Sequence, residues 1–403
     1  MKNFFAFVVF TVLIFCCLQG THNEAHTVSH KGGLTNEPRI VASTTALLVS
    51  AWPKSLSDVR NTARGRGAAA TGKLKWKRNI HAGSAFDPVL TNNGDICIGY
   101  ASNTLAILDA VTGMPDARFT PENNPDAPQH GFGATTVGPD GTLYVGGVDE
   151  KFFALDGQTG SEKWSFRSKY SDLFTPACIG KDGTVYVGAR DWEIYALDGK
   201  TGKKKWGFRT GDRVEAAPAL GPDGTVYATS VDASVYALDG ETGKKEWRFR
   251  AADVIYSSPV LGDDGTLYFV SKDGCVYALN STNGKRRWIF RMGGLTHGSP
   301  ALGLNHTVYI GCEDHKLYAL NSRTGSKRWV FRAGSYLDAS PSIASDGTVY
   351  IGCYDHNLYA VEGNTGRMKW SFRTGGSIST NPAIASDGTV YFTADDGFLY
   401  AVQ

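Results

Sequence analysis

Side chains that could bind or transform a ligand stand where the chain departs from a repeated pattern. His315 and His356 each follow an aspartate at equivalent places in two neighbouring repeats, and His297 stands just ahead of the first of them, in "GLTHGSP". Imidazole binds metals and moves protons near neutral pH, whereas a single histidine on a loop is usually solvated. We therefore predict a ligand-recognition face and neither a metal site nor a catalytic residue set. The candidates are His130, Trp192, Arg213, Glu215, His297, His315 and His356.

The cysteines do not form a metal or disulfide pattern. Past residue 20 their number is odd and no C-x-x-C pair occurs. Cys312 and Cys353 hold the same place in neighbouring repeats. We predict that both are small buried side chains at a strand end, with a disulfide between them as the alternative.

One aspartate recurs in each full repeat, between two expected strands. Short Asp side chains stabilise such turns by accepting hydrogen bonds from the local backbone. A ring of carboxylates that binds a cation is the alternative. The aspartates are Asp149, Asp191, Asp232, Asp273, Asp314, Asp355 and Asp396.

These residues lie on an internal repeat of about 41 residues. Trp164, Trp206, Trp247, Trp288, Trp329 and Trp370 follow one another at intervals of 42, 41, 41, 41 and 41 residues. A second marker of the type D-G-T-V-Y occurs in seven copies, and an eighth, degenerate copy is "NGDICIGY" at residue 93. Each unit contains four short runs of β-branched and aromatic residues separated by glycine-containing turns. Four antiparallel strands in a repeat of this length are typical of a propeller blade.

The two ends of the repeat region complement each other. The last unit stops at "FLYAVQ", before its fourth strand, while Trp76 in "GKLKWKRNI" precedes the first unit. Residues 72–80 would then supply the outer strand of the last blade and remove an open sheet edge. We predict an all-β fold, an eight-bladed β-propeller of four-stranded antiparallel blades closed by an N-terminal strand. The seven tryptophans, Trp76 included, are expected to wedge between neighbouring blades.

An arginine follows the tryptophan in most repeats, three residues further on. Charge on the outermost strands protects their edges from pairing with other sheets. An acidic partner bound along the rim is the alternative explanation.

The N-terminus has the form of an export signal. Lys2 precedes an apolar run over residues 4–18, the length of a signal-peptide core, with a short membrane anchor as the alternative. We predict a signal peptide over residues 1–20, a flexible leader over 21–71 and the propeller over 72–403. No apolar run past residue 20 could span a bilayer, and a net charge of +2 gives no reason to expect nucleic acid as a partner. We expect a secreted monomer, periplasmic or outer-membrane associated if the source is bacterial.

The segment "ALDGKTGKKKW" resembles the tryptophan-docking motif A-x-D-x-x-T-G-x-x-x-W of PQQ-like propeller repeats. Quinoprotein alcohol dehydrogenases and BamB-like assembly scaffolds share this motif, and the resemblance covers residues 72–403. It implies eight blades. The dehydrogenases carry an adjacent cysteine pair and a Glu, Asn and Asp set that binds calcium against the quinone. This chain offers no such pair after the signal and no clear calcium set, so no cofactor-binding residue is carried over.

Three functions remain open. The first, which we predict, is a secreted, non-catalytic propeller that binds a protein or other extracellular ligand on its loop face, and the next two are alternatives. The second is a dehydrogenase that depends on PQQ and calcium as cofactors. The third is a glycan or cell-surface binding module, in which loop aromatics such as Trp192 would contact the sugar.

Overall fold

The computed structural model describes Asp58 and residues 63–65, 67, 69–80, 87–100, 104–120, 135–147, 150–168 and 175–403. By its contacts the chain divides into residues 1–46 and 47–403, and only the second unit is described. The expected signal peptide at residues 1–20 and most of the expected leader lie outside the described residues. All regular structure in the described part is β-strand. It contains no helix long and apolar enough to cross a membrane.

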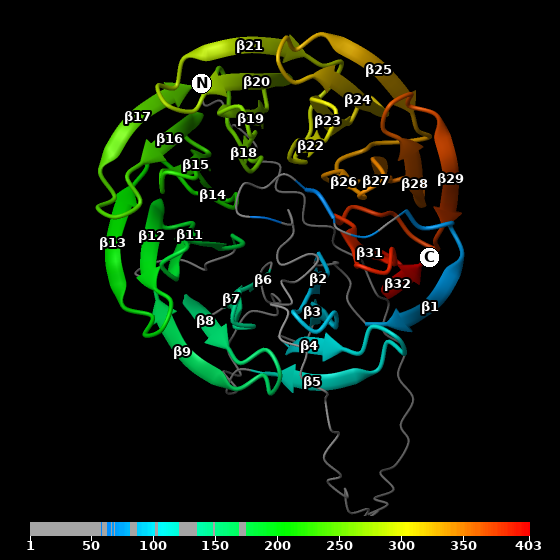
Figure 1. Ribbon diagram of the computed structural model, residues 1–403, viewed down its shortest axis with the longest axis horizontal. Helices are drawn as coiled ribbons and strands as arrows, with labels where there is room; N and C mark the ends of the chain where they lie inside the picture. Colours follow the sequence, from blue (N-terminus) through cyan, green and yellow to red (C-terminus); the bar gives the residue numbers. More distant parts are fainter. Residues whose placement is uncertain are drawn as a thin grey trace, which may run out of the picture. The chain divides into compact units, whose positions relative to one another are not determined.

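Eight four-stranded antiparallel sheets form the ring of blades seen in Figure 1, each with its shortest strand innermost. Blade 1 comprises β2 (Val89–Leu90), β3 (Ile96–Tyr100), β4 (Thr104–Leu108) and β5 (Pro115–Phe119), and blade 2 comprises β6 (Thr136–Val137), β7 (Leu143–Gly146), β8 (Lys151–Leu155) and β9 (Glu162–Arg167). Blade 3 comprises β10 (Cys178–Ile179), β11 (Thr184–Gly188), β12 (Glu193–Asp198) and β13 (Lys204–Arg209), and blade 4 comprises β14 (Ala219–Leu220), β15 (Val226–Ser230), β16 (Ser234–Leu238) and β17 (Lys245–Arg250). Blade 5 comprises β18 (Val260–Leu261), β19 (Thr266–Ser271), β20 (Cys275–Asn280) and β21 (Arg286–Arg291), and blade 6 comprises β22 (Ala301–Gly303), β23 (Thr307–Cys312), β24 (Lys316–Asn321) and β25 (Lys327–Arg332). Blade 7 comprises β26 (Ser342–Ile343), β27 (Thr348–Gly352), β28 (Asn357–Glu362) and β29 (Met368–Arg373), and blade 8 comprises β30 (Ala383–Ile384), β31 (Val390–Ala394), β32 (Phe398–Val402) and β1 (Leu74–Asn79).

The predicted closure of the ring is confirmed. Strand β1 pairs antiparallel with β32, and Trp76 lies opposite Ala401 while Asn79 lies opposite Phe398. Two further hydrogen bonds of 2.8 Å join the backbones of Lys73 and Gln403. The first strand in sequence therefore completes the last blade, which leaves no blade without its outer strand.

The contacts of the propeller extend upstream of the expected boundary at residue 72. Arg64 forms a parallel bridge with Ile343 of the innermost strand of blade 7. The backbone nitrogen of Gly65 donates to the carbonyl of Ile343 at 2.7 Å, and the nitrogen of Ile343 donates to the carbonyl of Ala63 at 2.9 Å. Residues 63–65, assigned by the sequence to a flexible leader, thus pair with a blade. The side chain of Arg64 also donates to the carbonyls of Leu302 and Gly303 in blade 6. A bridge of three residues is too short to show the alternating side-chain pattern of a strand, which explains why the sequence did not reveal it.

Each recurrent tryptophan joins its own blade to the next one, as predicted. The indole Nε1 of Trp206 donates to the carbonyl of Gly240 at 2.9 Å. The ring packs against Gly243, where an added Cβ would meet it at 2.7 Å and where φ is +71°. The glycine of the T-G dipeptide is therefore required for two reasons, the positive φ of the turn and the close approach of the ring. The other contacts of this kind are Trp76 to Ala110, Trp164 to Gly199, Trp247 to Ser281, Trp288 to Ser322, Trp329 to Gly363 and Trp370 to Ala70.

The recurrent aspartates stabilise turns, which was the first of the two explanations offered by the sequence. In blade 4 the Oδ1 atom of Asp232 accepts a hydrogen bond from the nitrogen of Ser234 at 2.9 Å. Its Oδ2 atom accepts from the nitrogen of Gly211 at 2.9 Å and from the hydroxyl of Tyr236. One carboxylate thus ties the turn between the second and third strands to the loop that enters the blade.

Buried tyrosines make the fold sensitive to alkali. Burial raises the pKa of Tyr144, Tyr186 and Tyr236 to about 12, and the carboxylate of Asp232 adds to the effect on Tyr236. Since these phenols ionise near pH 10 when unfolded, the stability they contribute is complete below pH 10 and is lost as the pH rises to about 12. We expect the free energy of unfolding, measured in urea at a series of pH values, to fall steadily across this window. A Tyr236→Phe variant should show a shallower fall, and an unfolding free energy that stays constant up to pH 12 would contradict the expectation.

Candidate binding site at the mouth of the central channel

Two sets of loops lie on one face of the ring. The turn between the second and third strands of a blade bonds to the loop that enters the same blade. In blade 4 the nitrogen of Val231 donates to the carbonyl of Arg213, and in blade 6 the nitrogen of Glu313 donates to the carbonyl of Leu295, both at 2.9 Å. Antiparallel pairing places the turn between the first and second strands on the opposite face. The described candidates from the sequence all belong to the first face.

A chain of hydrogen bonds fixes the inner rim of this face from blade 4 through blade 8 to blade 1. The backbone nitrogen of one residue in each blade donates to the side chain of the equivalent residue in the next blade, over distances of 2.6–3.0 Å. Most of these residues are 41 positions apart, one repeat length. In order they are Ala217, Ser258, Ser299, Ser340, Asn381 and Asp87. These bonds satisfy backbone donors that enter no sheet and hold neighbouring blades in register.

A pocket of about 350 Å³ lies at the channel mouth beside this rim. In blades 4 to 8 the residue two positions before the rim residue also lines the pocket. The chemistry of this residue differs from blade to blade. From blade 4 to blade 8 these residues are Glu215, Tyr256, His297, Asp338 and Ser379. The sequence singled out Glu215 and His297 but missed the other three. Alignment of the repeats at this loop position would have revealed them.

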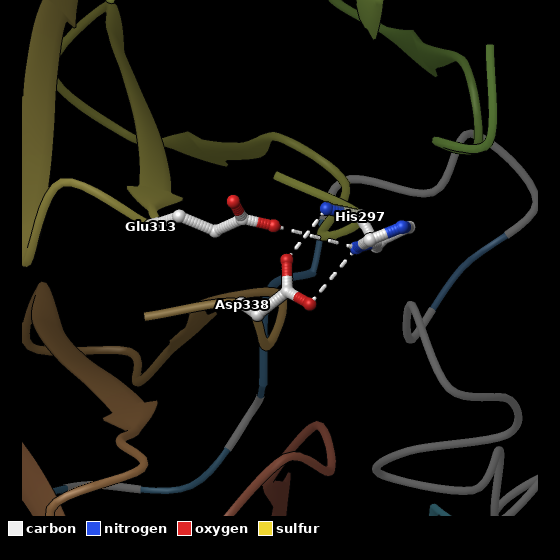
Figure 2. Close-up of side chains that lie close together, drawn as sticks. All are labelled: His297, Glu313 and Asp338. Carbon is white, nitrogen blue, oxygen red and sulfur yellow. Dashed lines mark hydrogen bonds and ion pairs between the residues drawn. The ribbon is translucent and has the colours of Figure 1, made fainter. Parts of the chain in front are cut away.

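Three of the side chains near the pocket converge from different loops, as Figure 2 shows. His297 lies between β21 and β22, Glu313 between β23 and β24, and Asp338 between β25 and β26. The Nδ1 atom of His297 is 3.0 Å from Oδ2 of Asp338 and 3.9 Å from Oε1 of Glu313. The backbone nitrogen of His297 donates to Oδ1 of Asp338 at 2.6 Å. Blades 6 and 7 therefore present an imidazole between two carboxylates.

The charge of Glu215 is balanced by arginines outside the pocket. Its Oε1 atom is 3.1 Å from Nε of Arg190 and 3.1 Å from Nη1 of Arg213. The structure thus joins the predicted candidates Arg213 and Glu215 in one ion-pair network. The glutamate borders the pocket, while Arg213 is not among its lining residues.

Trp192, His315 and His356 occupy one turn position in three blades. All three have positive φ, of 74°, 65° and 71°, at a place where blades 5 and 8 have glycine. Their carbonyls accept hydrogen bonds of 2.8–2.9 Å from the residue that follows the outer strand. A bulky residue in this conformation costs energy relative to glycine, so the turn itself does not select these side chains. His130, the remaining candidate, lies outside the described residues.

An exposed aromatic cluster adjoins His315. Its ring is 5.3 Å from that of Tyr336, which in turn is 6.2 Å from the ring of Tyr354. Tyr336 and Tyr354 are 48% and 38% exposed, although both are large apolar rings. Neither tyrosine was among the residues predicted from the sequence, because neither belongs to the recurrent pattern of the repeat. They give the face a surface that another molecule could bury.

The cysteines are structural, as predicted. All five in the described part are free and buried, and the alternative disulfide between Cys312 and Cys353 is not formed. Burial raises the pKa of Cys97, Cys312 and Cys353 to about 12. These thiols stay protonated at neutral pH and are poor nucleophiles.

The described lining of the pocket does not fit pyrroloquinoline quinone. This cofactor is a planar tricarboxylate, so a matching site would present cations and flat apolar surfaces. The pocket instead presents Asp87, Glu215 and Asp338, and no lysine or arginine is among the described residues that line it. The carboxylates of the pocket would repel the carboxylates of the cofactor. The mouth is suited to a cationic or neutral polar group.

Comparisons with known proteins agree with the architecture. A family model described as outer membrane protein assembly factor BamB matches residues 68–219 and 191–403. The crystal structure of BamB from Moraxella catarrhalis is similar over 82% of this chain and 97% of its own, with a TM-score of 0.66 and 21% identity. Quinohemoprotein alcohol dehydrogenase from Comamonas testosteroni is similar over 87% of this chain and 80% of its own, with a TM-score of 0.72 and 15% identity. A europium-containing methanol dehydrogenase is similar over 85% of this chain and 89% of its own, with a TM-score of 0.70 and 14% identity. No curated protein matches the chain by sequence. At these identities the structural likeness shows the fold alone.

Proposed function

The chain belongs to the family described as outer membrane protein assembly factor BamB, and from this premise we propose that it is a non-catalytic scaffold. It binds a partner protein on the face around the channel mouth. The family name refers to protein assembly at the outer membrane, and residues 4–18 have the form of an export signal. We accordingly place the protein outside the cytoplasm.

One observation carries the proposal: on one face, a hydrogen-bonded rim that recurs in each blade lies beside a position whose side chain changes from blade to blade. Along the rim the same backbone-to-side-chain hydrogen bond recurs from blade to blade, whereas the lining position beside it holds five different residues. Next to it, Tyr336 and Tyr354 expose aromatic surface. Aromatic anchors beside desolvated polar groups are typical of protein interfaces. Because the described mouth is acidic, the matching partner surface carries basic side chains next to an apolar group.

The two other functions draw less support from the same face. The guanidinium of Arg209 lies 5.2 Å from the ring centre of Trp192 and covers one side of it, which leaves less of the indole for stacking against a sugar. A PQQ-dependent dehydrogenase would need cationic groups for the quinone, and the described lining offers carboxylates. Similarity of fold to dehydrogenases carries no activity by itself.

The scaffold proposal is tested by capture of partners with matched surface variants. Purified protein immobilised through its C-terminus would be exposed to envelope extract of the source cells, and bound proteins quantified. We expect the double variant Tyr336→Ala/Tyr354→Ala to capture at least tenfold less partner than the unaltered protein. The reason is that each hot-spot aromatic residue contributes about 2 kcal/mol or more to the binding free energy. Leu304→Ala is the control, because Leu304 is 62% exposed in the turn between β22 and β23 on the opposite face.

One result would overturn the assigned binding surface, and another would overturn the scaffold function itself. Equal capture by the double variant and the control would show that the aromatic cluster is not the binding surface. Tight binding of added PQQ and calcium, with dye-linked oxidation of an alcohol, would establish an enzyme instead.

A further inference from the structure

The spacing of three donor atoms at the channel mouth matches a metal coordination shell. In a tetrahedral zinc site the metal–ligand bonds of 2.0–2.2 Å place neighbouring donors about 3.4 Å apart. The distances from Nδ1 of His297 to the nearest oxygens of Asp338 and Glu313 are 3.0 and 3.9 Å, one below and one above that value. All three donor atoms lie within 4.8 Å of one another. Small side-chain rotations would therefore bring them to bonding distance of one ion.

The donors are held in place by bonds that a metal would leave intact. The Oδ1 atom of Asp338 accepts from the backbone nitrogen of His297 at 2.6 Å and from the hydroxyl of Thr296 at 3.3 Å, which leaves Oδ2 facing the imidazole. The turn that carries Glu313 is tied to the loop of His297 through the bond from Glu313 N to Leu295 O at 2.9 Å. Bonds of this kind orient ligands and raise metal affinity.

The surroundings favour a cation and leave room for a further ligand. Asp87 lines the same pocket, the charge of Glu215 is already balanced by Arg190 and Arg213, and lysine and arginine are absent from the described lining. Three protein donors leave the fourth position of a tetrahedral ion open, as in sites that exchange water or bind a substrate. The imidazole nitrogen distinguishes this site from those for calcium and magnesium, which take oxygen ligands, and suits zinc and its neighbours in the transition series.

We propose that His297, Glu313 and Asp338 bind a divalent transition-metal ion of the zinc type at the mouth of the central channel. The ion takes Nδ1 of His297 and one oxygen from each carboxylate as its ligands. Its open position faces the pocket, where a donor group of a bound molecule can complete the coordination. This inference goes beyond the scaffold function and does not depend on the identity of any partner.

In the test, tag-free, metal-stripped full-length protein is titrated with zinc, and isothermal titration calorimetry measures the heat of binding. A parallel titration with cobalt(II) uses its visible absorption, which reports coordination by nitrogen and oxygen donors. We expect one saturable site in which zinc and cobalt compete. His297→Ala and Glu313→Gln should each weaken the affinity at least tenfold. The chain has nine histidines in all, so His297→Ala leaves eight others as a test against non-specific binding.

The controls separate a metal site from a simple ion pair. His315→Ala removes a histidine of the same face whose ring contacts Tyr336, and it should leave the affinity unchanged. Glu313→Gln keeps the shape of the side chain, so a loss of affinity in this variant with an unchanged thermal midpoint supports coordination. The proposal is overturned if no saturable site is found, or if His297→Ala binds as tightly as the unaltered protein. It is equally overturned if His315→Ala loses as much affinity as His297→Ala.

Discussion

Trp206→Ala is expected to lower the free energy of unfolding by about 3–5 kcal/mol, the range for deleting a large aromatic ring from a packed core. The indole is 9% exposed and fills the junction between blades 3 and 4. Loss of the indole removes its hydrogen bond to Gly240 and its contact with Gly243. Because residue 243 is a glycine, it has no side chain that could fill the cavity left by the ring. Chemical unfolding followed by circular dichroism measures the change.

A tryptophan of the same protein provides the matched control for this substitution. Trp192 is 41% exposed on the loop face. It lies in the turn between β11 and β12 and is not one of the tryptophans that join neighbouring blades. We expect Trp192→Ala to change the unfolding free energy by less than about 0.5 kcal/mol, as for most surface substitutions. Equal losses in the two variants would mean that the recurrent tryptophans do not lock the blades together.

Removal of the first strand is expected to have the larger effect of the two. A chain that begins at residue 81 lacks β1, so the edge of β32 is left without its partner over the whole pairing from Leu74 to Asn79. Trp370 also loses the carbonyl of Ala70 to which it donates at 2.9 Å. An exposed edge strand pairs with other chains. We expect loss of the cooperative thermal transition and the appearance of oligomers in size-exclusion chromatography.

Two further samples make the truncation informative. A chain that begins at Asp58 retains all the contacts of residues 63–80 and should unfold as the full chain does. A synthetic peptide of residues 63–80, added to the chain that begins at residue 81, should restore the monomer and the transition, because its bonds to blades 7 and 8 are non-covalent. A monomeric truncated chain with an unchanged midpoint would show that the ring does not depend on this closure.

The repeat made most of the fold predictable from sequence. A blade is a local unit, so its four strands follow from short-range patterns such as D-G-T-V-Y and from glycines at turns. The constant interval between Trp206, Trp247 and their equivalents indicated the repeat length, and the eight copies of the D-G-T-V-Y marker, one of them degenerate, indicated the number of blades. The unmatched Trp76 and the missing last strand together predicted the pairing of β1 with β32. Residues 63–65 escaped prediction because their bridge to blade 7 is only three residues long, too short to show the alternating side-chain pattern of a strand.

The candidate site was only partly visible in the sequence. His297 and Glu215 were recognisable as departures from the repeat, but their partners depend on the curvature of the ring. His297 and Asp338 are 41 residues apart and meet because equivalent loops of adjacent blades lie side by side at the narrow inner rim. Glu313 joins them because a turn of blade 6 folds back onto the loop that enters the same blade.

The amino-acid sequence by itself determined the blade, the number of blades and the strand that closes them, since each rests on contacts that recur at a fixed interval. Only the tertiary structure decided which of the variable side chains share a pocket. Closing the ring brings loops one repeat apart within hydrogen-bonding distance at the channel, while it keeps Trp192 and His356 on separate blades of the same face. Convergence of that kind is set by the radius of the ring and the direction of each loop, and no local pattern encodes either one.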